Sequence, residues 1–105
     1  MVAQVRGEVR LVAPTAISHA LLDGELVSVF ASGESLLTDR SLSDLEALLG
    51  ARFVRVHRRA LLDLAHVDRL RPLPSGGYLA ITRTGHDVPV SRQAARALRR
   101  QLGIR

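Results

Sequence analysis

The pattern of apolar and polar residues predicts a chain built mainly from short strands. Short apolar-rich segments occupy residues 8–12, 16–21, 26–31, 35–38, 53–57, 61–64, 67–70, 78–82 and 87–90. Turn signals or a proline separate several of these segments, at Pro14, Asp23-Gly24, Ser32-Gly33 and Thr84-Gly85. Such segments between tight-turn dipeptides are typical of antiparallel strands. We therefore expect a mainly-β fold.

The segment SLSDLEALLG, residues 41–50, has the periodicity of a short helix instead. Ser43 and Glu46 have the spacing of a capping box, and Gly50 is placed to end the helix in a left-handed conformation. The expected apolar stripe consists of Leu45, Leu48 and Leu49. This segment predicts a helix of about two turns in the middle of the chain.

The last segment, SRQAARALRRQLG, predicts a second helix with Ser91 as its N-cap and Gly103 as its stop. At about 100° per residue, one arc of this helix contains Ala94, Ala95, Leu98 and Leu102. The adjoining arc contains Arg92, Arg96, Arg99 and Arg100. The helix should therefore pack through alanines and leucines and expose a ridge of arginines.

The segment FVRVHRRALLDL, residues 53–64, begins as a strand and then departs from strand periodicity. His57, Arg58 and Arg59 follow one another before the apolar run resumes at Ala60. Neighbouring side chains of a strand point to opposite faces, so three adjacent polar residues cannot all avoid a core unless the backbone turns. We expect the strand to end at His57, so that both arginines project from a strand end or loop.

The composition limits the chemistry of the chain. Its 105 residues, 47% of them hydrophobic, suit a single domain over residues 1–105. Cysteine is absent, which excludes disulfides, thiolate zinc sites and cysteine nucleophiles. No apolar run reaches membrane-spanning length, and the N-terminus lacks the apolar region of a signal peptide. We expect a cytoplasmic protein without membrane attachment.

Positive charge is concentrated in one half of the chain. All 15 basic residues are arginine, against 10 acidic residues, for a net charge of +5. Residues 1–50 contain three arginines and seven acidic residues, whereas residues 51–105 contain twelve and three. A basic half within one domain indicates a polyanionic partner. The alternative is a solvated surface that happens to be basic.

Catalytic and metal-binding patterns are missing from the sequence. The histidines, at positions 19, 57, 66 and 86, lack the paired spacing of metal ligands, and we expect their ring nitrogens to be satisfied within strands and loops. No serine lies in a nucleophile elbow, and no glycine-rich loop precedes a helix in phosphate-binding form. We expect neither enzymatic activity, nor a metal, nor a cofactor.

The common modes of nucleic-acid recognition also do not fit. A helix-turn-helix needs two consecutive helices, whereas about forty residues of strand pattern separate the two predicted here. Single-strand binders stack bases on aromatic side chains, and this chain has only Phe30, Phe53 and Tyr78. What remains is a β scaffold that presents arginines from loops, since the planar guanidinium can hold guanine or grip a phosphate.

Two linked motifs resemble the LytTR family of bacterial DNA-binding domains, of the LytR/AlgR type. The first is FVRVHRRALLDLAHVDRL, where the family has an aromatic residue, Arg, one residue, His-Arg-Ser or similar, and Leu-Val-Asn. The second is PSGGYLAITRTGHDVPVSRQAARAL, with a hairpin followed by Pro-Val-Ser-Arg at the start of a helix. The resemblance is strongest over residues 52–100. It implies an elongated fold of about ten short strands in several small antiparallel sheets, with a short central helix and a C-terminal helix.

The resemblance also implies an interface with double-stranded DNA. Family domains place loops in successive major grooves, usually at paired direct repeats in promoters, and the base-contacting position after the motif histidine falls on Arg58. The Ser-Arg position at the helix start falls on Ser91 and Arg92, and a third contact falls near Glu25, in a loop that is acidic here. Departures from the pattern are Arg59, where Ser or Asn is usual, and Asp63, where Asn is usual; Asp63 and Asp68 are expected to balance local arginines.

The predicted DNA-binding residues are Arg58, Arg59, Ser91, Arg92, Gln93 and Arg96, with Glu25 and His57 as further candidates. The charge of Glu25 counts against direct contact, and a structural role is favoured for His57, with a ring nitrogen satisfied by the backbone. For Arg55, a salt bridge at the rim and a phosphate contact are equally open.

The predicted function is the output module of a bacterial transcription regulator, monomeric alone and paired on DNA. Either the chain is a stand-alone regulator, or a receiver or sensor domain lies upstream in a longer natural chain. Two alternatives remain open, a protein-interaction module for an acidic partner and a general RNA binder.

Overall fold

The computed structural model of the chain describes residues 2–5 and 8–103, and the side chains of residues 8–103. Ten strands are described: β1 (Val2–Val5), β2 (Glu8–Leu11), β3 (Ile17–Asp23), β4 (Leu26–Ala31), β5 (Glu34–Thr38), β6 (Phe53–His57), β7 (Ala60–Asp63), β8 (Val67–Pro72), β9 (Tyr78–Thr82) and β10 (Asp87–Val90). The helices are α1 (Leu42–Leu49) and α2 (Arg92–Leu102), with short 3-10 turns at Pro14–Ala16, Gly50–Arg52 and Leu64–His66.

The strand pattern of the sequence is confirmed with small shifts. Four predicted strands, β4, β6, β9 and β10, begin and end at the predicted residues, and the others differ by one or two residues at their ends. The strand β1 was not predicted. It pairs with β2 on one side and β5 on the other, so it is held by long-range pairing.

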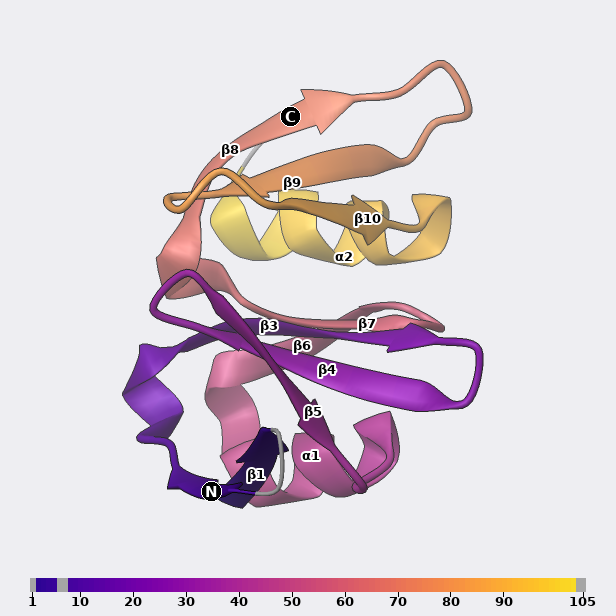
Figure 1. Cartoon of the computed structure of the whole chain (residues 1–105). Coiled ribbons are helices and arrows are strands. Elements are labelled where there is room, and N and C mark those ends of the chain that lie inside the picture. The colour runs from indigo at the N-terminus through magenta and orange to yellow at the C-terminus, as the bar shows by residue number, and fades with distance from the viewer. Residues whose placement is uncertain (1, 6–7, 104–105) are drawn as a thin grey trace.

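The strands form two antiparallel sheets. The larger sheet has the order β2-β1-β5-β4-β3-β7-β6, and the smaller has the order β10-β9-β8. Figure 1 shows α1 beside one face of the larger sheet and α2 between the two sheets. The molecule measures 45 × 24 × 24 Å along its principal axes. The predicted elongated, mainly-β class is confirmed, although the strands form two sheets rather than several.

Two hydrophobic clusters hold these layers together, and β7 contributes to both. Leu61 belongs to the cluster beneath α1, whereas Ala60 and Leu62 belong to the cluster shared by α2 and the smaller sheet. All three side chains are fully buried. A strand covered on both faces needs an uninterrupted apolar run, which explains why Ala60, Leu61 and Leu62 do not alternate with polar residues.

The start of α1 lies two residues earlier than the sequence predicted. Ser41, rather than Ser43, is the N-cap: its hydroxyl accepts from Asp44 N at 3.0 Å, and the Asp44 carboxylate accepts from Ser41 N at 3.4 Å. The expected partner Glu46 lies further along the helix. The buried stripe is therefore formed by Leu42, Leu45 and Leu49, and Leu48 is half exposed. At the C-cap, Gly50 has φ 79° but ψ −163°, outside the left-handed helical region.

The prediction for α2 is confirmed at both ends. Ser91 Oγ accepts from Ala94 N at 3.1 Å, and Gly103 ends the helix with a left-handed conformation at φ 73°. Ala95 and Leu98 are buried, as expected from the apolar arc. Leu102 is 47% exposed, so its predicted place in the packed arc was wrong, because the cluster ends one turn earlier.

Candidate nucleic-acid interface

The β6–β7 turn presents two arginines to solvent. His57 pairs with Ala60 across the turn, and Arg58 and Arg59 between them are both exposed. The register shifts between Arg55 and His57, as in a β-bulge. Bulges redirect side chains at strand ends. The prediction that the strand ends at His57, so that Arg58 and Arg59 project from a strand end or loop, is confirmed.

Hydrogen bonds within the turn fix its backbone. Arg55 donates from Nε to His57 O at 3.1 Å and from Nη2 to Arg58 O at 2.7 Å, while its Nη1 lies 3.7 Å from Glu46 Oε1 on α1. His57 Nδ1 accepts from Arg59 N at 3.1 Å, which is the backbone bond expected for this histidine. The sequence left open a salt bridge or a phosphate contact for Arg55. The structure shows the salt bridge, with Glu46, and two further hydrogen bonds to backbone carbonyls. The turn is thus pre-organised by a neighbouring strand residue.

The first turn of α2 lies beside the β6–β7 turn. Ser91 N donates to Val56 O at 2.8 Å, which ties the helix start directly to β6. A shallow hollow of about 350 Å³ between them is lined by Arg55, His57, Arg58, Ser91, Gln93, Ala94 and Ala97. The structure therefore brings together residues that are more than thirty positions apart in the sequence and were predicted as one site.

Three further exposed arginines come from the same turn and the same helix. Arg59 continues the turn, while Arg92 and Arg96 are exposed on α2. Among the residues that the structure describes, neither these three nor Arg58 has a carboxylate within ion-pair distance. We call the set formed by Arg58, Arg59, Ser91, Arg92, Gln93 and Arg96 the arginine surface.

Glu25 lies outside the arginine surface, in the β3–β4 turn. It lines a separate hollow of about 530 Å³ together with Arg40, Ser41 and other residues, and only Arg55 lines both hollows. Figure 1 shows the β3–β4 turn, the β6–β7 turn, the β8–β9 loop and the start of α2 along the same side of the molecule, on the right of the view. The three sequence-predicted contact regions thus lie on one side of the molecule, and the acidic β3–β4 turn lines a different hollow from the arginine surface.

Comparison with known proteins identifies the family. The family model described as the LytTr DNA-binding domain matches residues 7–103. The chain belongs to the LytTR family. A solved structure of the LytTr DNA-binding domain of a putative methyl-accepting/DNA response regulator from Bacillus cereus has the same fold, with a TM-score of 0.90 at 23% identity, covering 99% of this chain and 96% of that one.

Two relatives show how this LytTR domain compares with longer proteins. Sensory transduction protein LytT of Bacillus anthracis is 36% identical over 85 residues, covering 80% of this chain and 34% of that protein. The positive alginate biosynthesis regulatory protein of Pseudomonas aeruginosa is 33% identical over 101 residues, covering 93% and 40%. The chain thus spans little more than a third of the length of these relatives.

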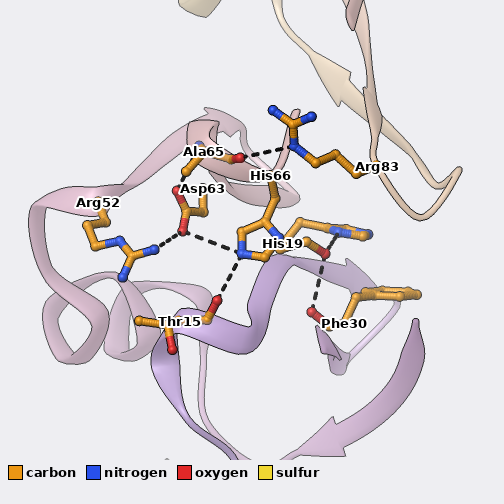
Figure 2. A network of polar contacts seen from close by, with 9 residues as sticks. Thr15, His19, Phe30, Arg52, Asp63, Ala65, His66 and Arg83 are labelled. Carbon is orange, nitrogen blue, oxygen red and sulfur yellow. Dashed lines mark hydrogen bonds and ion pairs between the residues drawn. The ribbon is translucent and has the colours of Figure 1, made fainter. Parts of the chain in front are cut away.

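Elsewhere in the LytTR domain, a buried carboxylate organises a polar junction (Figure 2). Asp63 is 2% exposed and accepts from Arg52 Nη2 at 2.9 Å and from Ala65 N at 3.0 Å. His66 Nε2 lies 2.9 Å from Thr15 O and 4.0 Å from Asp63 Oδ2. The predicted pairing of Asp63 with a local arginine is confirmed, and so is that of Asp68, which lies 3.6 Å from Arg69. These contacts join the 3-10 turns at Pro14–Ala16, Gly50–Arg52 and Leu64–His66 around the last residue of β7, and they make Asp63 structural.

His19 departs from the expectation that every histidine is satisfied. Its ring is fully buried and stacks on Phe30 with centroids 4.2 Å apart. Nδ1 lies 2.7 Å from Ser18 Oγ, but Nε2 has no hydrogen-bond partner within the described residues. Burial, followed by repulsion from His86 and His66, lowers the pKa of His19 from 6.5 to about 4. The expectation was wrong for this residue because tertiary packing closes around the ring.

Two further expectations concern metals and membranes. Over the described ranges, no group of three or more His, Asp or Glu side chains has the arrangement of a metal site. The helices described are also too short to cross a membrane.

Proposed function

We propose that this LytTR domain recognises specific sequences in double-stranded DNA, as the output module of a cytoplasmic bacterial transcription regulator. The observation that carries this proposal is the arginine surface, where Arg58 adjoins Ser91 and Gln93 at one hollow. Arginines that pair with no carboxylate among the described residues are available to neutralise phosphates and to read base edges. The fixed backbone around them lowers the ordering cost of binding.

The proposed division of labour follows from where the side chains originate. Arg58 and Arg92, from the turn and the helix start, read base edges, where the guanidinium fork can hold guanine O6 and N7 together. Arg59, Ser91, Gln93 and Arg96 contact the sugar-phosphate backbone and set the register of the domain on the duplex. His57 supports the turn. Glu25 would repel phosphate, so its turn contributes directly only if the carboxylate accepts from a cytosine amino group.

We further propose that single copies of the domain bind paired direct repeats in promoters. The domain would be monomeric alone and paired only on DNA, and a receiver or sensor domain of a longer natural chain would control it. Residues 1–105 would then act as one folding unit with no cofactor and no catalytic step.

The decisive experiment compares three probes of equal length. Cognate duplexes selected from random DNA should bind much more tightly than scrambled duplexes, and RNA should bind no better than the scrambled DNA. Equal affinity for all three would indicate only a general polyanion surface, and preference for RNA would favour the RNA-binding alternative. Salt dependence alone cannot decide, because any polyanion produces it.

Arg58→Ala and Arg59→Ala should differ although the two residues are adjacent and have the same charge. Arg58→Ala should weaken cognate binding by about 1–3 kcal/mol and relax preference at one or two base pairs. Arg59→Ala should weaken cognate and scrambled sites equally and flatten the plot of log affinity against log salt by about 1. Salt titrations of both variants on both duplexes measure this. Identical losses and slopes would contradict the assignment of Arg58 as the reader.

Substitutions at Ser91 can separate helix capping from DNA contact. Ser91→Ala removes the bond from Ala94 N and should lower the free energy of unfolding by about 1 kcal/mol. Ser91→Asp keeps a good cap, so stability should be retained, while its charge should repel phosphate and weaken DNA binding. Urea midpoints and affinities of both variants provide the test. Parental affinity in Ser91→Asp would remove Ser91 from the interface.

A further inference from the structure

The β8–β9 loop, residues 73–77, packs against the start of α2 through a glycine. A Cβ at the buried Gly77 would stand 2.6 Å from Val90 O and 3.5 Å from Arg92 N, so only a hydrogen fits there. The loop is closed by its own backbone, with Leu73 N donating to Gly77 O at 2.9 Å and Gly76 N to Leu73 O at 3.0 Å. The loop is therefore held at a fixed distance from the first turn of α2.

The neighbouring Gly76 meets the side chain of Arg92. A Cβ at Gly76 would lie 3.2 Å from both Cγ and Cδ of Arg92 and 3.5 Å from its Nε. The aliphatic stem of this arginine thus crosses the bare α-carbon of Gly76. The backbone of Gly76 has φ +94°, a conformation that residues with a Cβ rarely adopt.

We infer that Gly76 is a positioning residue that sets the path of the Arg92 side chain across the β8–β9 loop. This inference rests on the proposed function, in which Arg92 reads DNA. A long, flexible side chain loses rotamer freedom when it binds, and a preformed path reduces that loss. Gly76 would thereby contribute to sequence preference without touching the DNA.

The chain offers a matched control for the strain that any substitution at Gly76 introduces. Gly85, in the β9–β10 turn, has φ +87°, and a Cβ there would meet nothing within 4 Å. Gly76→Ala and Gly85→Ala should therefore lose similar stability, but only the first displaces Arg92. An off-rotamer arginine should lower cognate affinity about 2- to 12-fold in Gly76→Ala. Gly85→Ala should leave affinity unchanged.

A double-mutant cycle with Arg92→Ala gives the sharper test. Arg92→Ala alone should reduce cognate affinity about 5- to 150-fold, and adding Gly76→Ala should then cause no further loss. In the free protein, the Nε–H NMR signal of Arg92 should shift in Gly76→Ala and not in Gly85→Ala. Both results together would establish that Gly76 acts through this one side chain.

Several outcomes would overturn the inference. An equal effect of Gly76→Ala with and without Arg92, or equal losses in Gly76→Ala and Gly85→Ala, would leave Gly76 a merely structural turn residue while DNA recognition stands. Unchanged cognate affinity in Arg92→Ala would remove both Arg92 and Gly76 from recognition. If the parent protein does not distinguish cognate from scrambled duplex, the proposed function fails, and this inference fails with it.

Discussion

Leu98→Ala should lower the free energy of unfolding by about 2–5 kcal/mol, because it removes most of a fully buried side chain. Leu98 is 0% exposed and lies in the cluster that joins α2 to both sheets, with Val56 and Leu62 from the larger sheet and Val88 from the smaller. Truncation removes these contacts and leaves a cavity that close-packed neighbours cannot fill. The arginine surface depends on the same packing, since α2 carries half of it.

The control lies on the same helix. Leu102 belongs to the same helical arc by sequence, yet it is 47% exposed. Leu102→Ala should therefore change stability by less than about 0.5 kcal/mol. Urea midpoints of the two variants, with unchanged m-values, measure the difference. A Leu98→Ala protein as stable as the parent would show that α2 is not docked through this residue.

Features with local causes could be predicted from the sequence. Both ends of α2 follow from a serine cap and a glycine stop, and the end of β6 follows from three adjacent polar residues. The start of α1 could not be chosen locally, because Ser41 with Asp44 and Ser43 with Glu46 both have capping-box spacing. Burial of Leu42 in the cluster beneath α1 accompanies the earlier start. Tertiary packing therefore decides between the two possible helix starts.

Features that depend on irregular backbone geometry or on contacts between separate segments were missed. The role of Arg55 depends on a bulge that turns two carbonyls toward its guanidinium, and an alternating sequence gives no sign of it. The close approach of Gly76 to Arg92 joins positions from two separate elements. A glycine pair in a turn is too common to indicate such a contact. The family motifs predicted where the candidate site lies, whereas the contacts that hold it required the fold.

Acidification should destabilise the domain through His19 by up to about 3 kcal/mol. Ser18 Oγ donates to Phe30 O at 3.3 Å, so the bond between His19 Nδ1 and this hydroxyl needs Nδ1 to donate. A second proton must then enter at Nε2, which is buried and has no partner within the described residues. Burial therefore lowers the pKa of His19 to about 4, against 6.5 for an ordinary histidine.

The direction of the change in stability follows from which state, folded or unfolded, binds the proton more readily. Between pH 6.5 and 4 the unfolded chain is protonated at this position and the folded domain is not, so stability falls as the pH falls. Above pH 6.5 both states are neutral at His19, and this residue adds no pH dependence. Urea midpoints at pH 7.5 and 4.5 should reveal a loss of about 2–3 kcal/mol from this residue.

Replacing His19 with a ring that does not titrate separates its contribution to the pH dependence of stability from the contributions of other titrating groups. His19→Phe keeps a flat ring against Phe30 but cannot bind a proton, so its stability should fall less on acidification than that of the parent. The difference between the two pH profiles is the contribution of His19. Removing the nearby charge with His86→Gln should move the transition of His19 slightly upward, because repulsion from His86 helps to lower this pKa. Parallel profiles for the parent and His19→Phe would mean that the folded domain protonates His19 as readily as the unfolded chain does, and that the sheets open enough at this point to admit water.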